Sequence, residues 1–124
     1  MKAAFATQDC TRIDAHFGWA RHLVIYDVQP EGYHYETTVS FGSLVADGDE
    51  SKLEAKLAAV EGCALVFSTD IGDVAAARLA VRDIQAMLGY AGQPIVIALE
   101  QLQETLRHQP SAWIRRHLQR ERQG

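Results

Sequence analysis

One histidine in a short turn is the residue of this sequence best placed to meet a ligand. It lies in the segment Asp14-Ala15-His16-Phe17-Gly18, between two segments with the pattern of β-strands. Gly18 permits backbone angles that a side chain would forbid, and Phe17 can anchor the turn inward. The sequence therefore predicts that the imidazole of His16 is presented to a ligand rather than packed into the core.

Several neighbours of His16 carry groups that bind metals or anions. Imidazole nitrogens and thiolates are metal ligands, and guanidinium groups favour anions. A cleft lined by such groups would accept a metal-containing or anionic ligand. We expect six residues to surround one exposed cleft: Cys10, Arg12, Asp14, His16, Arg21 and His22.

Two predicted strands would deliver further polar residues to the same place. Residues 2–7 have the apolar pattern of a central strand, and residues 64–69 have that of a strand buried on both faces. Their carboxyl ends should meet at the edge of the sheet where ligands of open α/β sheets gather. The loop that carries His16 starts from this edge, so residues 7–10 and 68–70 should lie near it.

The other segments predict the rest of one mixed sheet and its helices. Residues 23–28 and 33–41 should form a hairpin whose second strand has one wet face and lies near a sheet edge. A capping box from Ser51 to Glu54 starts a helix that ends at Gly62. Further elements are expected at residues 74–81 (a helix with polar caps), 84–88 (a strand), 95–106 (a helix entered through Pro94) and from 111 (a short C-terminal helix).

This order of elements predicts an α/β fold. Strands that are joined through helices run parallel by right-handed crossovers, whereas the first three strands are joined by short links. We therefore expect a mixed sheet of about five strands with helices on both faces.

The composition is typical of one compact domain, residues 1–124, with 48% hydrophobic and 23% charged residues. No apolar run approaches the roughly 20 residues that span a bilayer, so we expect a cytoplasmic protein with reduced cysteines and no membrane partner. The net charge of −4 is unevenly divided, because residues 107–124 hold five arginines against one glutamate and form a basic tail. The acidic remainder argues against a nucleic-acid partner, which would need a basic face.

Three segments of the chain resemble a known family. Ala4-Phe5-Ala6-Thr7, followed by Ile13-Asp14-Ala15-His16-Phe17-Gly18 and Leu23-Val24-Ile25-Tyr26-Asp27-Val28, resembles the start of the nitrogenase iron-molybdenum cofactor biosynthesis family, of the NifX and NafY type and closest to NifX. The similarity continues through residues 47–53 to Gly62-Cys63 and ends in residues 110–116. It covers nearly the whole chain.

The resemblance implies a carrier and not an enzyme. Proteins of this family bind the iron-molybdenum cofactor or its iron-sulfur precursor, and hold it between cofactor assembly proteins and apo-dinitrogenase. The implied fold is a ribonuclease H-like, three-layer α/β/α arrangement with one antiparallel strand. His16 matches the family's histidine proposed as the cofactor ligand.

Physical chemistry then assigns roles to the groups around His16. A neutral imidazole nitrogen can occupy an open iron or molybdenum position, and one protein ligand suits a cluster that must leave again. We expect Cys10 as a second, soft ligand and Asp14 as the carboxylate that orients the imidazole. Cationic groups would offset the charge of the cluster: Arg12, Arg21 and His22.

A nuclease is the alternative from another class. Asp9, Asp14 and Asp70 follow predicted strands, where ribonuclease H-like enzymes place carboxylates for two magnesium ions. The acidic body would repel a polyanion, and the basic track that such an enzyme needs is missing. The carrier is therefore favoured.

A mononuclear zinc site is a third interpretation of the same region. Cys10, His16 and His22 are the donors, and their spacing of six residues matches no zinc finger. Cys63 precedes a buried strand and is expected to be a packing residue.

Overall fold

The computed structural model describes residues 1–41, 50–108, 112 and 114–116, with the backbone alone at 50–52. Its centre is a single sheet in the order β3-β2-β1-β4-β5. The strands are β1 (Lys2–Thr7), β2 (His22–Gln29), β3 (Gly32–Ser40), β4 (Leu65–Phe67) and β5 (Gln85–Met87). β2 runs antiparallel to β1 and β3, whereas β1, β4 and β5 run parallel to one another. The predicted mixed sheet with one antiparallel strand is confirmed.

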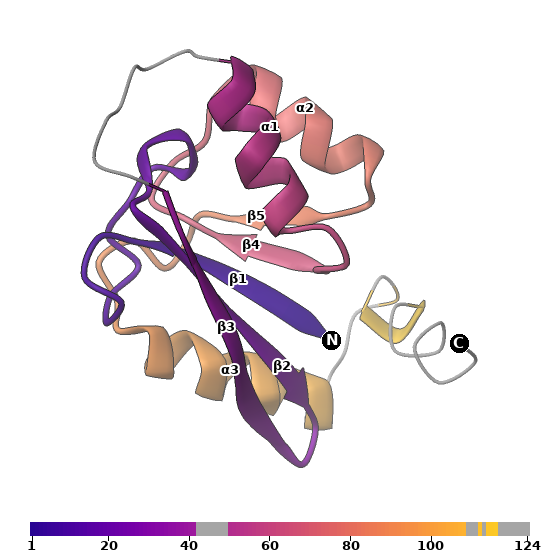
Figure 1. The fold of residues 1–124 in the computed structure, drawn as a ribbon. Coiled ribbons are helices and arrows are strands. Elements are labelled where there is room, and N and C mark those ends of the chain that lie inside the picture. Colours follow the sequence, from indigo (N-terminus) through magenta and orange to yellow (C-terminus); the bar gives the residue numbers. More distant parts are fainter. Residues whose placement is uncertain (42–49, 109–111, 113, 117–124) are drawn as a thin grey trace.

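Helices cover both faces of this sheet (Figure 1). α1 (Glu50–Ala59) and α2 (Asp73–Val81) lie on one face, and α3 (Ile95–His108) lies on the other. α3 follows Pro94, and its buried residues Ile95, Leu99, Leu102 and Leu106 lie on one side, as the helical period predicts. The three-layer α/β/α arrangement is therefore confirmed.

The central strand β1 separates two halves of the core. Alternate side chains of a strand point to opposite faces, so Phe5 packs on the α3 side, whereas Ala4 and Ala6 pack on the side of α1 and α2. The Phe5 ring stacks on Phe67 of β4, with 4.7 Å between ring centroids. Tight packing on both faces fixes the end of β1, from which the His16 loop departs.

Three local predictions need correction or qualification. α2 has Gly72 at its N-cap with no side-chain hydrogen bond, so the polar caps predicted for it are wrong. β5 is shorter than the predicted strand at 84–88. The capping box falls on Ser51, whose side chain lies outside the described part, and α1 already begins at Glu50.

Other predictions about the ends of elements fare differently. Gly62 has a positive φ of +87°, as expected of a glycine that follows a helix. The predicted helix stop at Pro110 and cap at Ser111 lie outside the described residues, while residues 112 and 114–116 are helical. None of the described helices has both the length and the apolarity needed to cross a membrane.

Candidate functional site

His16 opens a single turn of 3₁₀ helix, η1 (Phe17–Trp19), in the loop between β1 and β2. Its Nδ1 atom accepts a hydrogen bond from the backbone N–H of Gly18 at 2.9 Å, and its carbonyl accepts one from Trp19 N–H at 3.0 Å. The His16 side chain is half-buried, and Phe17 is fully buried. The predicted inward anchor is confirmed, and one edge of the imidazole is used to close the turn.

Gly18 is needed here for a reason that the sequence did not reveal. Its backbone does not adopt a positive φ, so the prediction of forbidden angles is wrong. A Cβ atom at this position would instead lie 3.3 Å from Nδ1 of His16, which is closer than a relaxed contact. The missing side chain leaves room for the imidazole.

The His16 turn is held by two elements distant in sequence. Phe17 N–H donates to the carbonyl of Asp70 at 3.0 Å, and Thr69 N–H donates to the carbonyl of Ala15 at 3.0 Å. From the other side, Nζ of Lys56 on α1 donates to the carbonyl of Gly18 at 2.7 Å. The ends of β1 and β4 therefore meet as predicted.

The bond between Gly18 and His16 fixes the tautomer of the imidazole. Since Nδ1 accepts a proton from Gly18 N–H, it carries none itself, and the neutral ring holds its proton on Nε2. A metal needs a free nitrogen lone pair. Coordination through either nitrogen of the neutral ring therefore requires the contact with Gly18 to open.

The neighbouring residues 8–12 form a separate turn built around Asp9. Oδ1 of Asp9 accepts hydrogen bonds from the N–H groups of Thr11 at 2.8 Å and Arg12 at 2.9 Å, and from the Thr7 hydroxyl at 3.1 Å. The bonds from the Arg12 and Thr11 amides hold the pKa of Asp9 below its ordinary value of 3.8. Asp9 thus shapes this loop as an anionic acceptor.

Asp14 also serves the backbone instead of the imidazole. Its Oδ1 accepts from Gln8 N–H at 2.8 Å and from the Thr7 hydroxyl at 3.3 Å. The orienting bond that we predicted from Asp14 to His16 is replaced by the bond from Gly18 N–H, so that detail of the prediction is wrong.

The other predicted site residues lie around the same edge of the sheet. Cys10 is exposed and has a positive φ of 65°, and Arg12 donates through Nη1 to the carbonyl of Gly92 at 3.2 Å. Arg21 is exposed, and its N–H donates to Gln8 Oε1 at 3.0 Å. His22 pairs with Thr7 across β1 and β2, and its Nδ1 lies 2.8 Å from Ser40 Oγ. The hydrogen bonds of these side chains connect them to loop and strand neighbours, not to the imidazole.

No three His, Cys, Asp or Glu side chains in the described part of the chain lie close enough to hold a metal ion together. This applies both to the zinc set around Cys10 and to the magnesium set around Asp9. Asp70 Oδ1 instead accepts the N–H of Ile71 at 2.8 Å. Neither alternative gains support from the structure.

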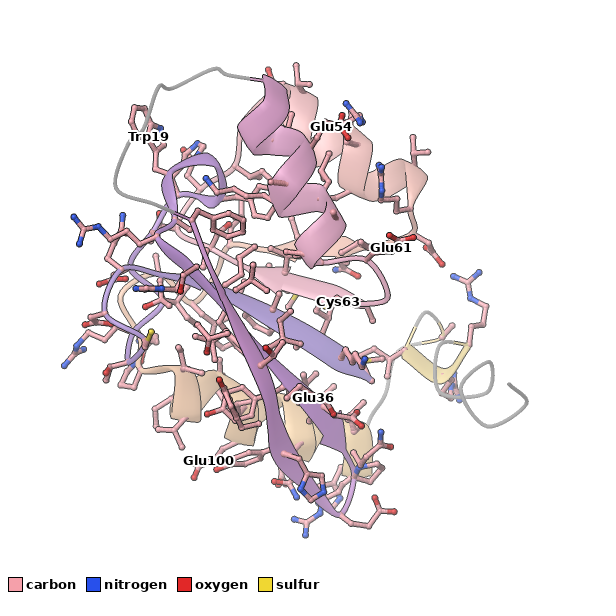
Figure 2. All side chains as sticks on the ribbon, in the orientation of Figure 1. Trp19, Glu36, Glu54, Glu61, Cys63 and Glu100 are labelled. Carbon is pink, nitrogen blue, oxygen red and sulfur yellow. The ribbon has the colours of Figure 1, made fainter. Side chains whose placement is uncertain are left out.

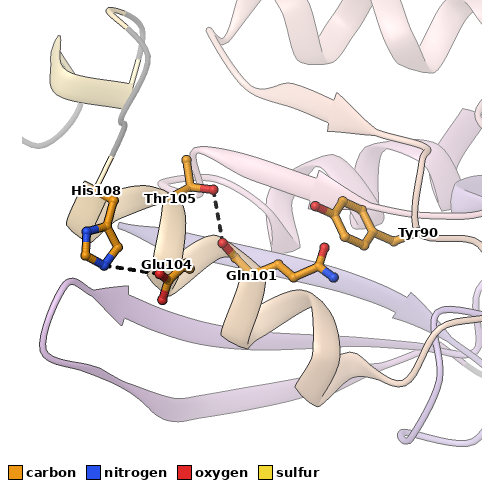
Figure 3. Close-up of a pocket in the computed structure, with 5 residues that line it drawn as sticks. All are labelled: Tyr90, Gln101, Glu104, Thr105 and His108. Atoms are coloured by element: carbon orange, nitrogen blue, oxygen red, sulfur yellow. Dashed lines mark hydrogen bonds and ion pairs between the residues drawn. The ribbon is translucent and has the colours of Figure 1, made fainter.

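The larger clefts of the molecule lie elsewhere, beside α3. One, of about 360 Å³, is lined by Tyr90, Gln101, Glu104, Thr105 and His108 (Figure 3). His108 pairs with Glu104 one turn away at 3.1 Å. A smaller, apolar cleft of about 110 Å³ adjoins it through Tyr90 and Thr105. These clefts contain none of the predicted site residues.

Two residues near His16 escaped the sequence prediction. Trp19 projects from the turn and is 42% exposed (Figure 2). Lys56 is 3% exposed, and a pattern in α1 could have found it, because it lies one helical turn from both Leu53 and Val60 on the apolar face. A lysine at such a position must find a buried acceptor.

Comparison with known proteins bears on this site. Residues 1–105 match the family described as dinitrogenase iron-molybdenum cofactor. The NifX protein of Herbaspirillum seropedicae is 41% identical over 97% of this chain and 83% of its own length. The NifX protein of Azotobacter vinelandii is 38% identical over 98% of this chain and 77% of its own length.

The fold has solved counterparts as well. The crystal structure of PH0822 superposes with a TM-score of 0.63 at 22% identity, and the match covers 91% of this chain and 97% of that one. At this identity the likeness supports the fold alone. The family match and the two NifX relatives together show that this chain belongs to the dinitrogenase iron-molybdenum cofactor family, as a member of the NifX type.

Proposed function

We propose that this protein is a carrier for the iron-molybdenum cofactor or its iron-sulfur precursor. It receives the cluster from cofactor assembly proteins and delivers it towards apo-dinitrogenase. Family membership ties the chain to iron-molybdenum cofactor biosynthesis. The observation that carries the proposal is the half-buried imidazole of His16, in a turn fixed by bonds to Asp70, Thr69 and Lys56.

His16 is proposed as the metal ligand. Binding the cluster exchanges one contact for another: the imidazole gives up the N–H of Gly18 and offers a nitrogen to iron or molybdenum. Because the turn remains tied to the β4-α2 loop and to α1, the backbone of His16 stays in place while its ring reorients. The return of the Gly18 bond favours release, which suits a transfer protein.

The surrounding groups are proposed to assist through charge and a second donor. Arg12 and Arg21 are exposed at this edge, where their guanidinium groups would attract an anionic cluster. His22 adds a positive charge when protonated, and Cys10 offers a thiolate. Asp14 supports the loop through Gln8 and Thr7 and takes no direct part. A carrier needs no catalytic group, and we assign none.

Anaerobic uptake followed by iron and molybdenum analysis tests this function. The apo-protein should bind with a free energy of roughly −8 to −12 kcal/mol, which corresponds to a micromolar to nanomolar dissociation constant. The metal ratio distinguishes the finished cofactor from its molybdenum-free precursor. His16→Ala should lose most uptake while the fold remains, since the side chain is only half-buried.

A matched control comes from β3. His34 is exposed on that edge strand, near the hairpin and opposite Asp27, so His34→Ala removes an imidazole far from the β1 end. It should bind as the unchanged protein does. Equal retention of cofactor by both variants would remove His16 from the proposed site.

A further inference from the structure

Lys56 places a charged group inside the molecule, next to the His16 turn. The residue is 3% exposed, and it is the only charged side chain that is buried among those the structure describes. Its ammonium lies 2.7 Å from the carbonyl oxygen of Gly18 and 5.2 Å from the centroid of the Phe41 ring. Burying an ammonium group is costly unless its environment compensates, so this placement requires an explanation.

The contact acts on the peptide group that holds His16. The carbonyl bound by Lys56 and the N–H of Trp19 belong to the same planar peptide, between residues 18 and 19. That N–H donates to the carbonyl of His16 at 3.0 Å. The preceding peptide supplies the Gly18 N–H that meets Nδ1 at 2.9 Å. Lys56 is therefore one rigid peptide away from both contacts that orient His16.

The aromatic ring beside the ammonium strengthens this arrangement. Phe41 is half-buried, and its N–H donates to the carbonyl of Arg21 at 2.8 Å, which ties it to the start of β2. A cation over an aromatic face is attracted by the ring quadrupole. Lys56 is thus held from two sides and can fix the turn without moving itself.

We propose that Lys56 is the positioning residue of the cofactor site, because it holds the Gly18-Trp19 peptide and thereby sets the tautomer and orientation of His16. This inference rests on the proposed function for its biological meaning. The positioning itself is a property of the apo-protein. It can therefore be measured without any cofactor.

The first test reads the His16 ring in the apo-protein. Long-range proton-nitrogen NMR spectra report which imidazole nitrogen carries the proton. The unchanged protein should show Nδ1 as an unprotonated acceptor. Lys56→Met, which keeps the length of the side chain but removes its donor and charge, should leave His16 exchanging between tautomers. Lys56→Arg should restore the fixed tautomer, and Lys2→Met, at an exposed position near the start of β1, should have no effect.

The second test measures anaerobic cofactor uptake by the same variants, at a temperature where circular dichroism shows each to be folded. Removal of an outer partner of a metal ligand commonly weakens binding about 10- to 100-fold, and we expect Lys56→Met to fall in this range. Lys56→Arg should recover most of the loss. If Lys56→Met does not fold, Lys56→Gln, which keeps a neutral donor, replaces it and should show a partial loss of the fixed tautomer.

The two tests separate the possible failures. A fixed His16 tautomer and full uptake in the folded Lys56 variant would overturn the positioning role, even if His16→Ala abolishes uptake. If the unchanged protein takes up no cluster while its tautomer still depends on Lys56, the carrier function fails and the positioning role stands.

Discussion

The two turns at the ligand edge of the sheet are held in different ways. The turn of residues 8–12 is closed from within, by the carboxylate of Asp9 accepting from Thr11 and Arg12. The His16 turn is closed by one internal bond to Nδ1 and is otherwise fixed from outside, through Asp70 and Lys56. A side chain that closes its own loop cannot leave it without loss of the loop. His16 can exchange its one contact for a ligand because other elements keep its backbone in place.

The strongest test of this difference removes the external anchor. Phe17 is fully buried in the core beside α1 and α2, so Phe17→Ala should lower the free energy of unfolding by about 3–5 kcal/mol. Trp19→Ala, at the exposed end of the same turn, should cost less than about 1 kcal/mol. Urea unfolding of both variants measures the contrast, and similar losses would show that the turn is not anchored through Phe17.

A substitution at Gly18 sharpens the comparison inside the turn. The new Cβ of Gly18→Ala would lie 3.3 Å from Nδ1, so the ring must shift and its bond to the amide must weaken. We expect cofactor affinity to fall about tenfold, the lower end for a perturbed metal ligand, with little change in stability. Gly32→Ala, where a Cβ meets nothing within 4 Å, is the control in the uptake assay. Equal affinities would mean that the ring position at Gly18 is not important.

Thiol labelling asks whether the first turn contributes a ligand. Cys10 is exposed, whereas burial raises the pKa of the Cys63 thiol to about 11. At neutral pH, iodoacetamide should therefore modify Cys10 alone, and mass spectrometry of the digest checks the site. We expect the labelled protein to lose less uptake than His16→Ala does. A complete loss would make Cys10 an equal ligand.

Acid should affect the first turn alone. Because the pKa of Asp9 is lowered in the folded protein, its contacts are fully present above the ordinary value of 3.8 and are lost as the pH falls through the lowered value. The amide signals of Thr11 and Arg12 should shift over that range in an NMR titration, and Asp9→Asn should abolish this titration. Unchanged signals would show that the carboxylate does not close the turn.

The framework of the fold was predictable because it depends on periodic patterns. The apolar run of β1 and the spacing of Ile95, Leu99, Leu102 and Leu106 in α3 have one compact solution, and the structure has it. The position of His16 beside the end of β4 followed from the same order of elements. Contacts across the sequence did not follow, because no pattern pairs Lys56 with a carbonyl 38 residues away.

The missed details of the site have a common physical origin. The sequence indicates which groups can bond but not which acceptor they choose when several are near. Asp14 could have oriented the imidazole, yet its carboxylate closes the loop at Gln8, and the amide of Gly18 takes the imidazole instead. Gly18 was correctly expected to matter, but it matters through space beside Nδ1 and not through its backbone angles.

The central claim is that the His16 imidazole binds the cluster after release from its cap, and His16→Asn tests it most directly. Asparagine can accept from the Gly18 amide as a short polar cap, so it preserves the turn but supplies no imidazole. Anaerobic uptake should be as low in His16→Asn as in His16→Ala, while its stability should match that of the unchanged protein. Uptake restored by asparagine would contradict the account, because the turn itself and not the imidazole would then hold the cluster.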